Sequence, residues 1–544
     1  MKYQDDFSQS ARFDFWANAL AASFLALAIF RFWLAPLPSS YWLDETGTAW
    51  AVKDGLRQML ARIREGPTVT PLYGFVALAA SAIGGTREYV LRLPSLLGVM
   101  GATVFVYLIA SRLMNRACAY SSVVLFICSD MVIFAATDAR PYGMALLAMT
   151  CSTYALIRWL DSGVFAAGLA YVFTAAAIPH LHILSPLVLI AHALYIYKRM
   201  QTDARVRIGQ VIVCAAAIIL LTIPLVPVFR ELFRTREMHA FADRPSLFSF
   251  AEVMFPPVMT LGLGAGYLTA RLFKGGFEHC AVKLDSAGLW LACGFFTPVL
   301  VLFVLSRAGS NSMFVPRYMN ASQVGLALLG GCLIGTIASS GVRAIVNTCV
   351  IVCALFASGS LSHFWPRHAG EDWRGAIATA RAAVQKRDMP VLIQSGFVEA
   401  SAERFDFAQP LPAFLLAPLA VYGTPGKGIV LPYRLDAAAQ RYLETSVVPL
   451  LQNSQSFLLI TRGTSSPYMN WLAAKLGLSD IRPLGNFGAV EVIECKNSGP
   501  IAGNNSIALG QTKITPTTIK ACCGTGTSRR PGKPLSAWMS CWRS

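Results

Sequence analysis

The sequence predicts a polytopic α-helical membrane protein with a small C-terminal α/β domain. Of its 544 residues, 55% are apolar and only 14% are charged, and its mean hydropathy is +0.51. Soluble proteins carry about 25% charged residues. The apolar residues form blocks of about the length that a helix needs to cross a bilayer. These observations exclude a soluble cytosolic enzyme, a chain disordered throughout and a secreted scaffold built on disulfides.

The apolar blocks are expected to form eleven membrane-spanning helices. The first block, 16–34, follows a mixed-charge stretch and lacks a small-residue cleavage site, so it is expected to stay in place as an uncleaved helix. The other ten blocks are 93–111, 117–136, 141–160, 164–179, 183–197, 208–229, 251–270, 287–306, 322–339 and 344–360.

A further short apolar block, 68–83, determines the expected topology. If it spanned the membrane, the basic loops at 112–116 and 198–207 would face outward for an N-terminus inside the cell. If it lies along the membrane, both loops face the cytoplasm, as the positive-inside rule favours. The prolines at its start and its short length favour the second arrangement. Residues 35–92 are therefore expected to form one long external loop.

A change of composition near residue 361 ends the membrane module, 1–360, and begins a domain expected to be periplasmic and to cover 361–497. Charges become regular there and apolar runs shorten. Amphipathic helices are predicted at 373–387 and 436–451, and buried strands at 391–393, 457–460 and 489–493. The tail, 498–544, is rich in Gly, Ser, Thr and Pro, carries six Lys or Arg and no acid, and is expected to be disordered.

The net charge of +17 does not indicate nucleic-acid binding. Basic residues are scattered between the apolar blocks, without a zinc-finger, RNP or helix-turn-helix pattern. Cytoplasmic loops of membrane proteins generally carry excess Lys and Arg. The 13 cysteines show no CxxC or Cys/His ligand spacing, so neither a zinc site nor a disulfide framework is expected.

The first candidate for chemistry is the acidic pair Asp44 and Glu45, about ten residues after the first apolar block. The aromatic residues Tyr41 and Trp42 just before it suit the headgroup interface. A partly desolvated carboxylate there could take a proton from an acceptor hydroxyl. A solvated acidic loop is the alternative interpretation of the pair.

The second candidate lies between blocks 117–136 and 141–160. Pro141 fits the first turn of the following helix. Arg140 could bind a phosphate or a leaving-group oxyanion with two parallel hydrogen bonds. Asp138 could orient an acceptor or hold a metal, and Tyr142 could contact substrate. Interfacial capping with an arginine that reaches toward the headgroups is the alternative.

Two later loops offer further polar groups on the same side of the membrane. Arg317 and its neighbour Tyr318 are candidate contacts to a phosphate, with simple interface anchoring as the alternative. His180 and His182 are candidate contacts to substrate or to the first loop. Two histidines without a third ligand do not indicate a metal site. No Walker loop, GxSxG elbow or HExxH motif is present.

Several short motifs occur in one order along the chain. The acidic pair precedes Pro71-Leu72-Tyr73, the segment 89–95 and the segment 138–142, and later come 315–318 and 371–375. This order resembles the bacterial branch of the protein mannosyltransferase-like family 39, in the C-type membrane glycosyltransferase superfamily. The lipid A aminoarabinose transferase is a better-known relative. The resemblance covers about residues 15–400.

The resemblance implies a polyprenyl-phosphate sugar donor, used on the outer face of the membrane without a nucleotide. By position, Asp44 with its neighbour Glu45 matches the acid of the first external loop, and Asp138 matches the acid of the second. Arg140 and Arg317 would contact the donor phosphate. A base on the face opposite the leaving phosphate would give inversion.

The sequence also departs from the better-studied relatives. Glu65-Gly66-Pro67 stands where a Glu-Lys-Pro-Pro motif is expected, so the resemblance does not extend to lipid A as acceptor. No WWD motif occurs, and no metal or other cofactor is expected.

The expected protein is therefore a hexosyl- or pentosyltransferase of the bacterial inner membrane with a lipid, glycan or protein acceptor. A transporter or flippase of lipid-linked sugars is one alternative, although such proteins tend to show repeated halves and charges at mid-membrane. A non-catalytic envelope-assembly protein with the same fold is the other. The joint presence of Asp44, Asp138 and Arg140 argues against it.

Overall fold

The computed structural model forms two compact units. Unit 1 consists of Met1–Ser39 and Ala51–His368, and unit 2 of Ser40–Trp50 and Ala369–Ser544. The segment that carries the acidic pair therefore groups with the C-terminal part of the chain. The structure describes residues 2–65, 69–234, 242–272, 284–309, 312–401, 413–426, 428–463 and 465–498. The tail expected to be disordered lies outside the described residues, except for Ser498.

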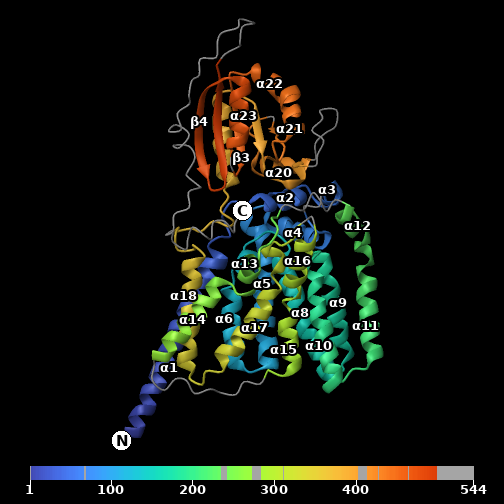
Figure 1. Ribbon diagram of the computed structural model, residues 1–544, viewed down its shortest axis with the longest axis vertical. Coiled ribbons are helices and arrows are strands. Elements are labelled where there is room, and N and C mark those ends of the chain that lie inside the picture. Colours follow the sequence, from blue (N-terminus) through green and yellow to red (C-terminus); the bar gives the residue numbers. More distant parts are fainter. Residues whose placement is uncertain are drawn as a thin grey trace. The chain divides into compact units, whose positions relative to one another are not determined.

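Unit 1 is helical (Figure 1). Its elements are α1 (Lys2–Ile29), η1 (Phe30–Leu34), α3 (Leu56–Glu65), α4 (Pro71–Gly84), α5 (Glu88–Leu113), α6 (Arg116–Ile127), α7 (Asp130–Ala136), α8 (Tyr142–Ser162), α9 (Phe165–Leu181), η2 (Ser185–Val188), α10 (Leu189–Thr202), α11 (Ile208–Thr222), η3 (Ile223–Leu225), α12 (Val226–Arg234), α13 (Leu247–Met254), α14 (Pro257–Leu272), α15 (Ser286–Gly294), α16 (Thr297–Ala308), η4 (Pro316–Met319), α17 (Ser322–Gly335) and α18 (Ser340–Ala357).

Every predicted apolar block contains a helix. Five helices in the described part of the chain are long and apolar enough to cross a membrane, and up to eight if each bent pair is one span. The bent pairs are α6 with α7 at 69°, α13 with α14 at 54° and α15 with α16 at 41°. The chain is therefore a polytopic membrane protein, as predicted, whereas the number of eleven spans stays a prediction.

Helix α4 covers the apolar block that was expected to lie along the membrane. It has 14 residues, which at 1.5 Å per residue gives about 21 Å. The hydrocarbon core of a bilayer is about 30 Å thick. Its length agrees with the predicted juxtamembrane helix, and the external location of the first loop stays a prediction.

The crossing of α5 and α8 sets the position of the turn that precedes α8. These helices run beside each other (Figure 1). A Cβ added at Gly98 would lie 2.7 Å from the carbonyl oxygen of Gly143, and one added at Gly143 would collide with the carbonyl oxygen of Ser95. Small residues allow helices in membranes to approach this closely. Gly98 and Gly143 thus permit a contact that larger side chains would prevent.

Unit 2 contains a five-stranded sheet and several helices. The strands have the order β2-β1-β3-β5-β4, with β1 parallel to β2 and β3, and β5 antiparallel to β3 and β4. The elements are α2 (Leu43–Val52, of which the residues up to Trp50 belong to unit 2), α19 (Trp373–Lys386), β1 (Val391–Gln394), η5 (Val398–Ser401), η6 (Ala413–Leu416), α20 (Ala417–Tyr422), β2 (Gly428–Val430), α21 (Ala437–Tyr442), η7 (Leu443–Val447), α22 (Val448–Gln452), β3 (Ser456–Arg462), α23 (Ser466–Leu476), β4 (Leu478–Phe487) and β5 (Val490–Asn497).

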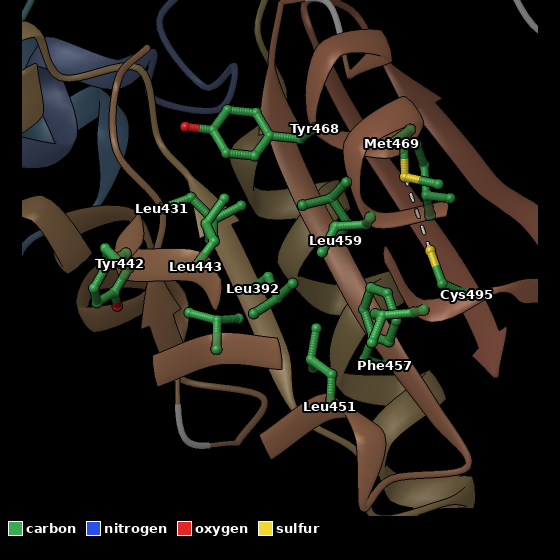
Figure 2. Close-up of a cluster of buried hydrophobic side chains, with 14 residues drawn as sticks. Leu392, Leu431, Tyr442, Leu443, Leu451, Phe457, Leu459, Tyr468, Met469 and Cys495 are labelled. Atoms are coloured by element: carbon green, nitrogen blue, oxygen red, sulfur yellow. Dashed lines mark hydrogen bonds between the residues drawn. The ribbon is translucent and has the colours of Figure 1, made fainter. Parts of the chain in front are cut away.

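The core of unit 2 joins the sheet to the helices from α21 to α23. Leu392 of β1 and Leu459 of β3 are buried neighbours in the parallel register, and they pack with Leu443 and Leu472 in one apolar cluster (Figure 2). The small α/β fold predicted for this part of the chain is therefore confirmed, including strands β1, β3 and β5 and helix α19. The predicted helical segment 436–451 forms α21, η7 and α22. Sequence patterns missed the strands β2 and β4 and the helices α2, α20 and α23.

The tight crossing of α5 and α8 gives the first testable prediction. Gly143→Ala should destabilise unit 1 by about 1–3 kcal/mol, because the added methyl meets a backbone carbonyl that cannot rotate away. Thermal unfolding in detergent micelles measures the loss. Gly264→Ala in α14 is the control, since nothing lies within 4 Å of its added Cβ. Equal unfolding temperatures for the two variants would contradict the assigned contact.

Candidate active site

Asp138 lies fully buried in the turn between α7 and α8 of unit 1. Helix α7 ends at Ala136, with Thr137 as its C-cap, and Pro141 is the N-cap of α8 with a φ of −68°. This value is the one that the proline ring favours. The Ser95 hydroxyl of α5 donates a hydrogen bond of 2.8 Å to the carbonyl oxygen of Arg140. This hydrogen bond holds the turn against α5, close to the crossing at Gly98 and Gly143.

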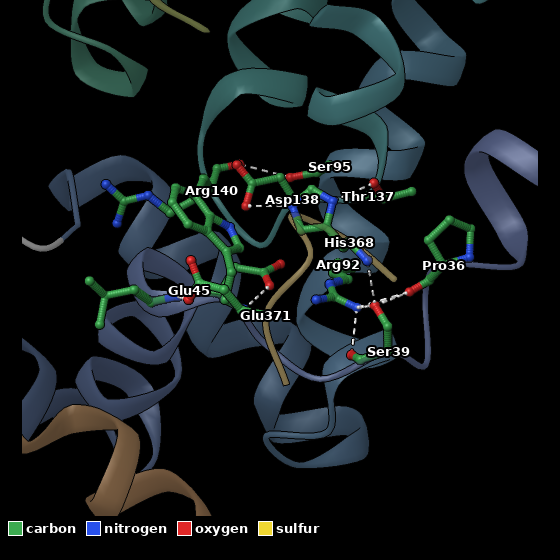
Figure 3. Close-up of polar contacts among 12 residues, drawn as sticks. Pro36, Ser39, Glu45, Arg92, Ser95, Thr137, Asp138, Arg140, His368 and Glu371 are labelled. Atoms are coloured by element: carbon green, nitrogen blue, oxygen red, sulfur yellow. Dashed lines mark hydrogen bonds and ion pairs between the residues drawn. The ribbon is translucent and has the colours of Figure 1, made fainter. Parts of the chain in front are cut away.

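An imidazole accompanies the Asp138 carboxylate. His368 is 4% exposed. Its Nδ1 lies 2.9 Å from Oγ1 of Thr137, and its Nε2 lies 3.5 Å from Oδ1 of Asp138 (Figure 3). Its ring packs on Phe134, with 4.8 Å between the ring centroids. Asp138 and His368 thus form a buried carboxylate–imidazole pair. His368 was not among the site residues that the sequence predicted.

Arg92, in the segment 89–95, is fully buried and binds the chain that leads to the acidic pair. Its Nη1 donates to the carbonyl oxygens of Pro36, Leu37 and Ser39 at 3.0, 2.9 and 2.8 Å, and to the Ser39 hydroxyl at 3.0 Å (Figure 3). The backbone N–H of His368 donates to the same hydroxyl at 3.1 Å. Arg92 therefore holds the segment 36–39, which follows η1.

A second group in unit 1 gathers two guanidinium groups around His182. The His182 ring lies 5.2 Å from the Tyr142 ring and 5.5 Å from the Tyr318 ring. The Arg317 guanidinium stands 5.5 Å from the centroid of the Tyr318 ring. Burial, and then the charges of Arg140 and Arg317, lower the pKa of His182 to about 3. We call these five residues the arginine–histidine cluster.

The arginine–histidine cluster has the electrostatics of an anion site. Its imidazole is neutral at physiological pH, so the two guanidinium groups supply its positive charge. Arginine binds phosphate oxygens through two parallel N–H groups and keeps its charge when partly buried. The structure thus brings five of the predicted residues together in unit 1.

His180 lies in different surroundings from His182. Its Nε2 lies 3.0 Å from the carbonyl oxygen of Leu221, at the end of α11, in an exposed region of unit 1. Helix α9 ends at Leu181, and His182 already has an extended backbone with ψ of 126°. The two histidines leave the helix end in different directions for this reason. Their predicted roles as contacts to substrate or to the first loop stay predictions.

The acidic pair of unit 2 begins helix α2. Asp44 and Glu45 are its second and third residues, Asp44 partly buried and Glu45 fully buried. The Glu45 Oε2 accepts a hydrogen bond of 3.2 Å from the backbone N–H of Trp42. This is one half of a reciprocal capping box. The positive end of the helix dipole favours the ionised form of carboxylates at such positions.

The predicted site residues are thus divided between the two units. Asp44 and Glu45 belong to unit 2, whereas Asp138 and the arginine–histidine cluster belong to unit 1. The catalytic and binding roles of these residues stay predictions. The joint action of the two groups stays a prediction.

Comparison with known proteins identifies the fold. No family model and no curated protein sequence matches the chain. The structure of ArnT from Cupriavidus metallidurans in the apo state is similar over 89% of this chain and 99% of ArnT, with 14% identity and a TM-score of 0.52. The structure of the same protein bound to undecaprenyl phosphate covers the same shares, with 12% identity and a TM-score of 0.51.

These structures confirm the fold that the sequence predicted. ArnT is a lipid A aminoarabinose transferase with the fold of the C-type membrane glycosyltransferases. The present chain has this fold, including its polytopic helical membrane part and its small C-terminal sheet. Identities of 14% and 12% carry the likeness no further than the fold.

The depressed pKa of His182 gives the second prediction. The unfolded chain binds a proton at this histidine below about pH 6.5, whereas the folded chain stays neutral down to about pH 3. Stability therefore falls as pH falls from 7 to 5, by about 2 kcal/mol from this group alone. His182→Gln should show a correspondingly shallower fall in denaturant unfolding at pH 7, 6 and 5. If the free energy of unfolding fell equally with pH in the wild type and in His182→Gln, His182 would not be a buried neutral imidazole.

Proposed function

We propose that the protein is a membrane glycosyltransferase that moves a sugar from a polyprenyl-phosphate donor to a hydroxyl of a lipid, glycan or protein. The reaction would take place on the periplasmic face of the bacterial inner membrane. The observation that carries the proposal is the arginine–histidine cluster within a fold shared with ArnT. One of the ArnT structures is bound to undecaprenyl phosphate.

The donor phosphate is assigned to Arg140 and Arg317. In the transfer, the bond between the anomeric carbon and the phosphate oxygen breaks, and the oxygen leaves with both electrons. Fixed cations stabilise this growing negative charge more effectively in a site poor in water than in bulk solvent. His182 is neutral, so the positive charge of the cluster comes from the two guanidinium groups. This arrangement suits a polyprenyl phosphate as leaving group.

The acceptor hydroxyl is assigned to Asp44, with Glu45 beside it. As the hydroxyl oxygen bonds to the anomeric carbon, its proton passes to the Asp44 carboxylate, and attack opposite the leaving phosphate inverts the anomeric centre. The Asp138–His368 pair would orient the acceptor.

A flippase for lipid-linked sugars is the second candidate function. The observation in its favour is the bend of 69° between α6 and α7, because broken helices are common in transporters. A flippase would move the lipid-linked sugar without releasing free polyprenyl phosphate. A transferase would release one polyprenyl phosphate for each sugar moved. The ratio of free polyprenyl phosphate to sugar moved therefore distinguishes a transferase, with a ratio of about one, from a flippase, with a ratio of about zero. A non-catalytic assembly protein would do neither.

Asp44→Asn should lower the rate of sugar transfer by about 10²- to 10⁴-fold, because the amide cannot accept the hydroxyl proton. Binding of undecaprenyl phosphate should change little. The assay follows radiolabelled lipid-linked sugars in membranes that contain either protein. Asp54→Asn is the matched control, since Asp54 is an exposed acid that pairs with Arg62. An Asp44→Asn enzyme with wild-type turnover would place the base elsewhere.

Arg140→Ala should weaken binding of free undecaprenyl phosphate by about 10- to 100-fold, the effect of losing a hydrogen bond to a charged group. Competition against the lipid-linked donor measures this affinity. Arg112→Ala removes an exposed arginine of unit 1 that pairs with Asp161, and it should leave the affinity unchanged. Equal competition in the wild type and both variants would remove Arg140 from the donor site.

A further inference from the structure

We propose that Glu371 is a positioning residue that holds the start of helix α2, and with it Asp44 and Glu45. The C-terminal part of the chain would then belong to the catalytic machinery instead of serving only to cover the site or dock the acceptor. The catalytic meaning of this assignment rests on the proposed function. The contacts that carry it all lie within unit 2.

Glu371 is a buried carboxylate with three donors. It is 1% exposed. Its Oε2 accepts the backbone N–H of Leu43 at 3.0 Å and the indole N–H of Trp373 at 2.8 Å, and its Oε1 accepts the Nε–H of Arg462 at 2.7 Å. A buried carboxylate is stable only with such partners. Glu371 therefore joins the first residue of α2 to residues that lie more than 300 positions later in the chain.

The backbone of Glu371 is itself fixed to the sheet. Glu371 forms an isolated antiparallel bridge with Gly488, and the next residue, Asp372, donates its N–H to Phe487 at 2.9 Å. Gly488 has a φ of +78°, and a Cβ there would collide with the carbonyl oxygen of Gly370. Asp372 also caps α19 by accepting the N–H of Gly375 at 2.9 Å. The side chain of Glu371 thus projects from a rigid support.

Glu371 and Glu45 share the donors at the start of α2. The first N–H groups of a helix have no partner within the helix and must find one outside it. Glu45 takes the N–H of Trp42, and Glu371 takes the N–H of Leu43. If Glu371 cannot accept, the Leu43 N–H becomes available to Glu45, and the acidic turn can reorient. The position of the Glu45 side chain therefore depends on the Glu371 carboxylate.

A second tie holds the residues just before α2. The Tyr422 hydroxyl accepts the backbone N–H of Tyr41 at 2.8 Å and lies 3.3 Å from the Ser40 hydroxyl. The Ser40 hydroxyl accepts the backbone N–H of Arg374 at 3.0 Å. Segment 40–50 is thus bound at two places by residues of the C-terminal part, which explains why it groups with that part.

The experiment compares Glu371→Gln and Tyr422→Phe with the wild type in two measurements. The first is the kcat and the donor KM of sugar transfer. The second is amide hydrogen exchange of peptides covering 41–50, which reports the start of α2 without any reaction. Asp436→Ala is the control, because Asp436 caps α21 in the same unit through the N–H groups of Ala438 and Ala439.

Glu371→Gln should lower kcat by about 10²-fold, as expected for a displaced reacting group, with a donor KM close to that of the wild type. Exchange over 41–50 should accelerate. The glutamine side chain has one oxygen instead of two, so its NH2 group faces at least one of the three N–H donors and the hydrogen bond there is lost. Tyr422→Phe, which keeps the ring, should produce the same pattern at smaller size. Asp436→Ala should keep both kcat and the exchange over 41–50.

Two results overturn the assignment. Unchanged exchange over 41–50 in Glu371→Gln would show that Glu371 does not hold the helix start. An equal fall of kcat in Asp436→Ala would show that any weakening of unit 2 lowers the rate. If the wild type transfers no sugar from any lipid-linked donor, the proposed function fails and the catalytic role of Glu371 fails with it. Faster exchange over 41–50 in Glu371→Gln would then still show that Glu371 holds the start of α2, although the protein is not a transferase.

Discussion

Buried ionisable side chains need polar partners, and this requirement shapes both units. Arg92 places its guanidinium among the carbonyl oxygens of 36–39. Glu371 accepts three N–H groups. Asp138 lies beside His368. Neither lipid nor a packed interior solvates such groups, so each one determines how distant chain segments meet.

The helices of unit 1 supply the framework on which these groups act. Because Gly98 and Gly143 lack side chains, α5 and α8 approach closely enough for Ser95 to reach the carbonyl of Arg140. The turn that carries Asp138 is consequently held by backbone contacts rather than by loop conformation alone. A site built on packed helices positions its reacting groups more accurately than one built on free loops.

The division of chemical roles follows the division of the chain. The residues suited to an anion lie in unit 1, where Arg140 and Arg317 flank a neutral His182. The acids suited to proton removal lie in unit 2, at the start of α2, where Glu371 and Tyr422 bind the backbone. In the proposed reaction the first group would receive the leaving phosphate and the second would prepare the nucleophile.

The apolar blocks of the sequence predicted the helices of the membrane part, and the regular charges beyond them predicted a small α/β part. In a membrane the backbone must bond within its own helix, so a long apolar block has few alternatives. Regular amphipathic spacing likewise predicted 373–387, against Trp373–Lys386 in the structure. Strand β4 was missed because most of its residues are exposed and show no alternation. The local sequence pattern predicted a helix or strand only where one face of that element, or the whole segment, is apolar.

Only the tertiary structure decided which polar groups meet. His368 contacts Thr137 across 231 residues, and Glu371 contacts Leu43 across 328. No local pattern encodes such a contact, because it depends on the path of the whole chain between the two residues. His180 and His182 are two positions apart, and the local end of α9 between them gives them different surroundings. Composition and periodicity specify elements, whereas the partners of buried charges follow from how those elements pack.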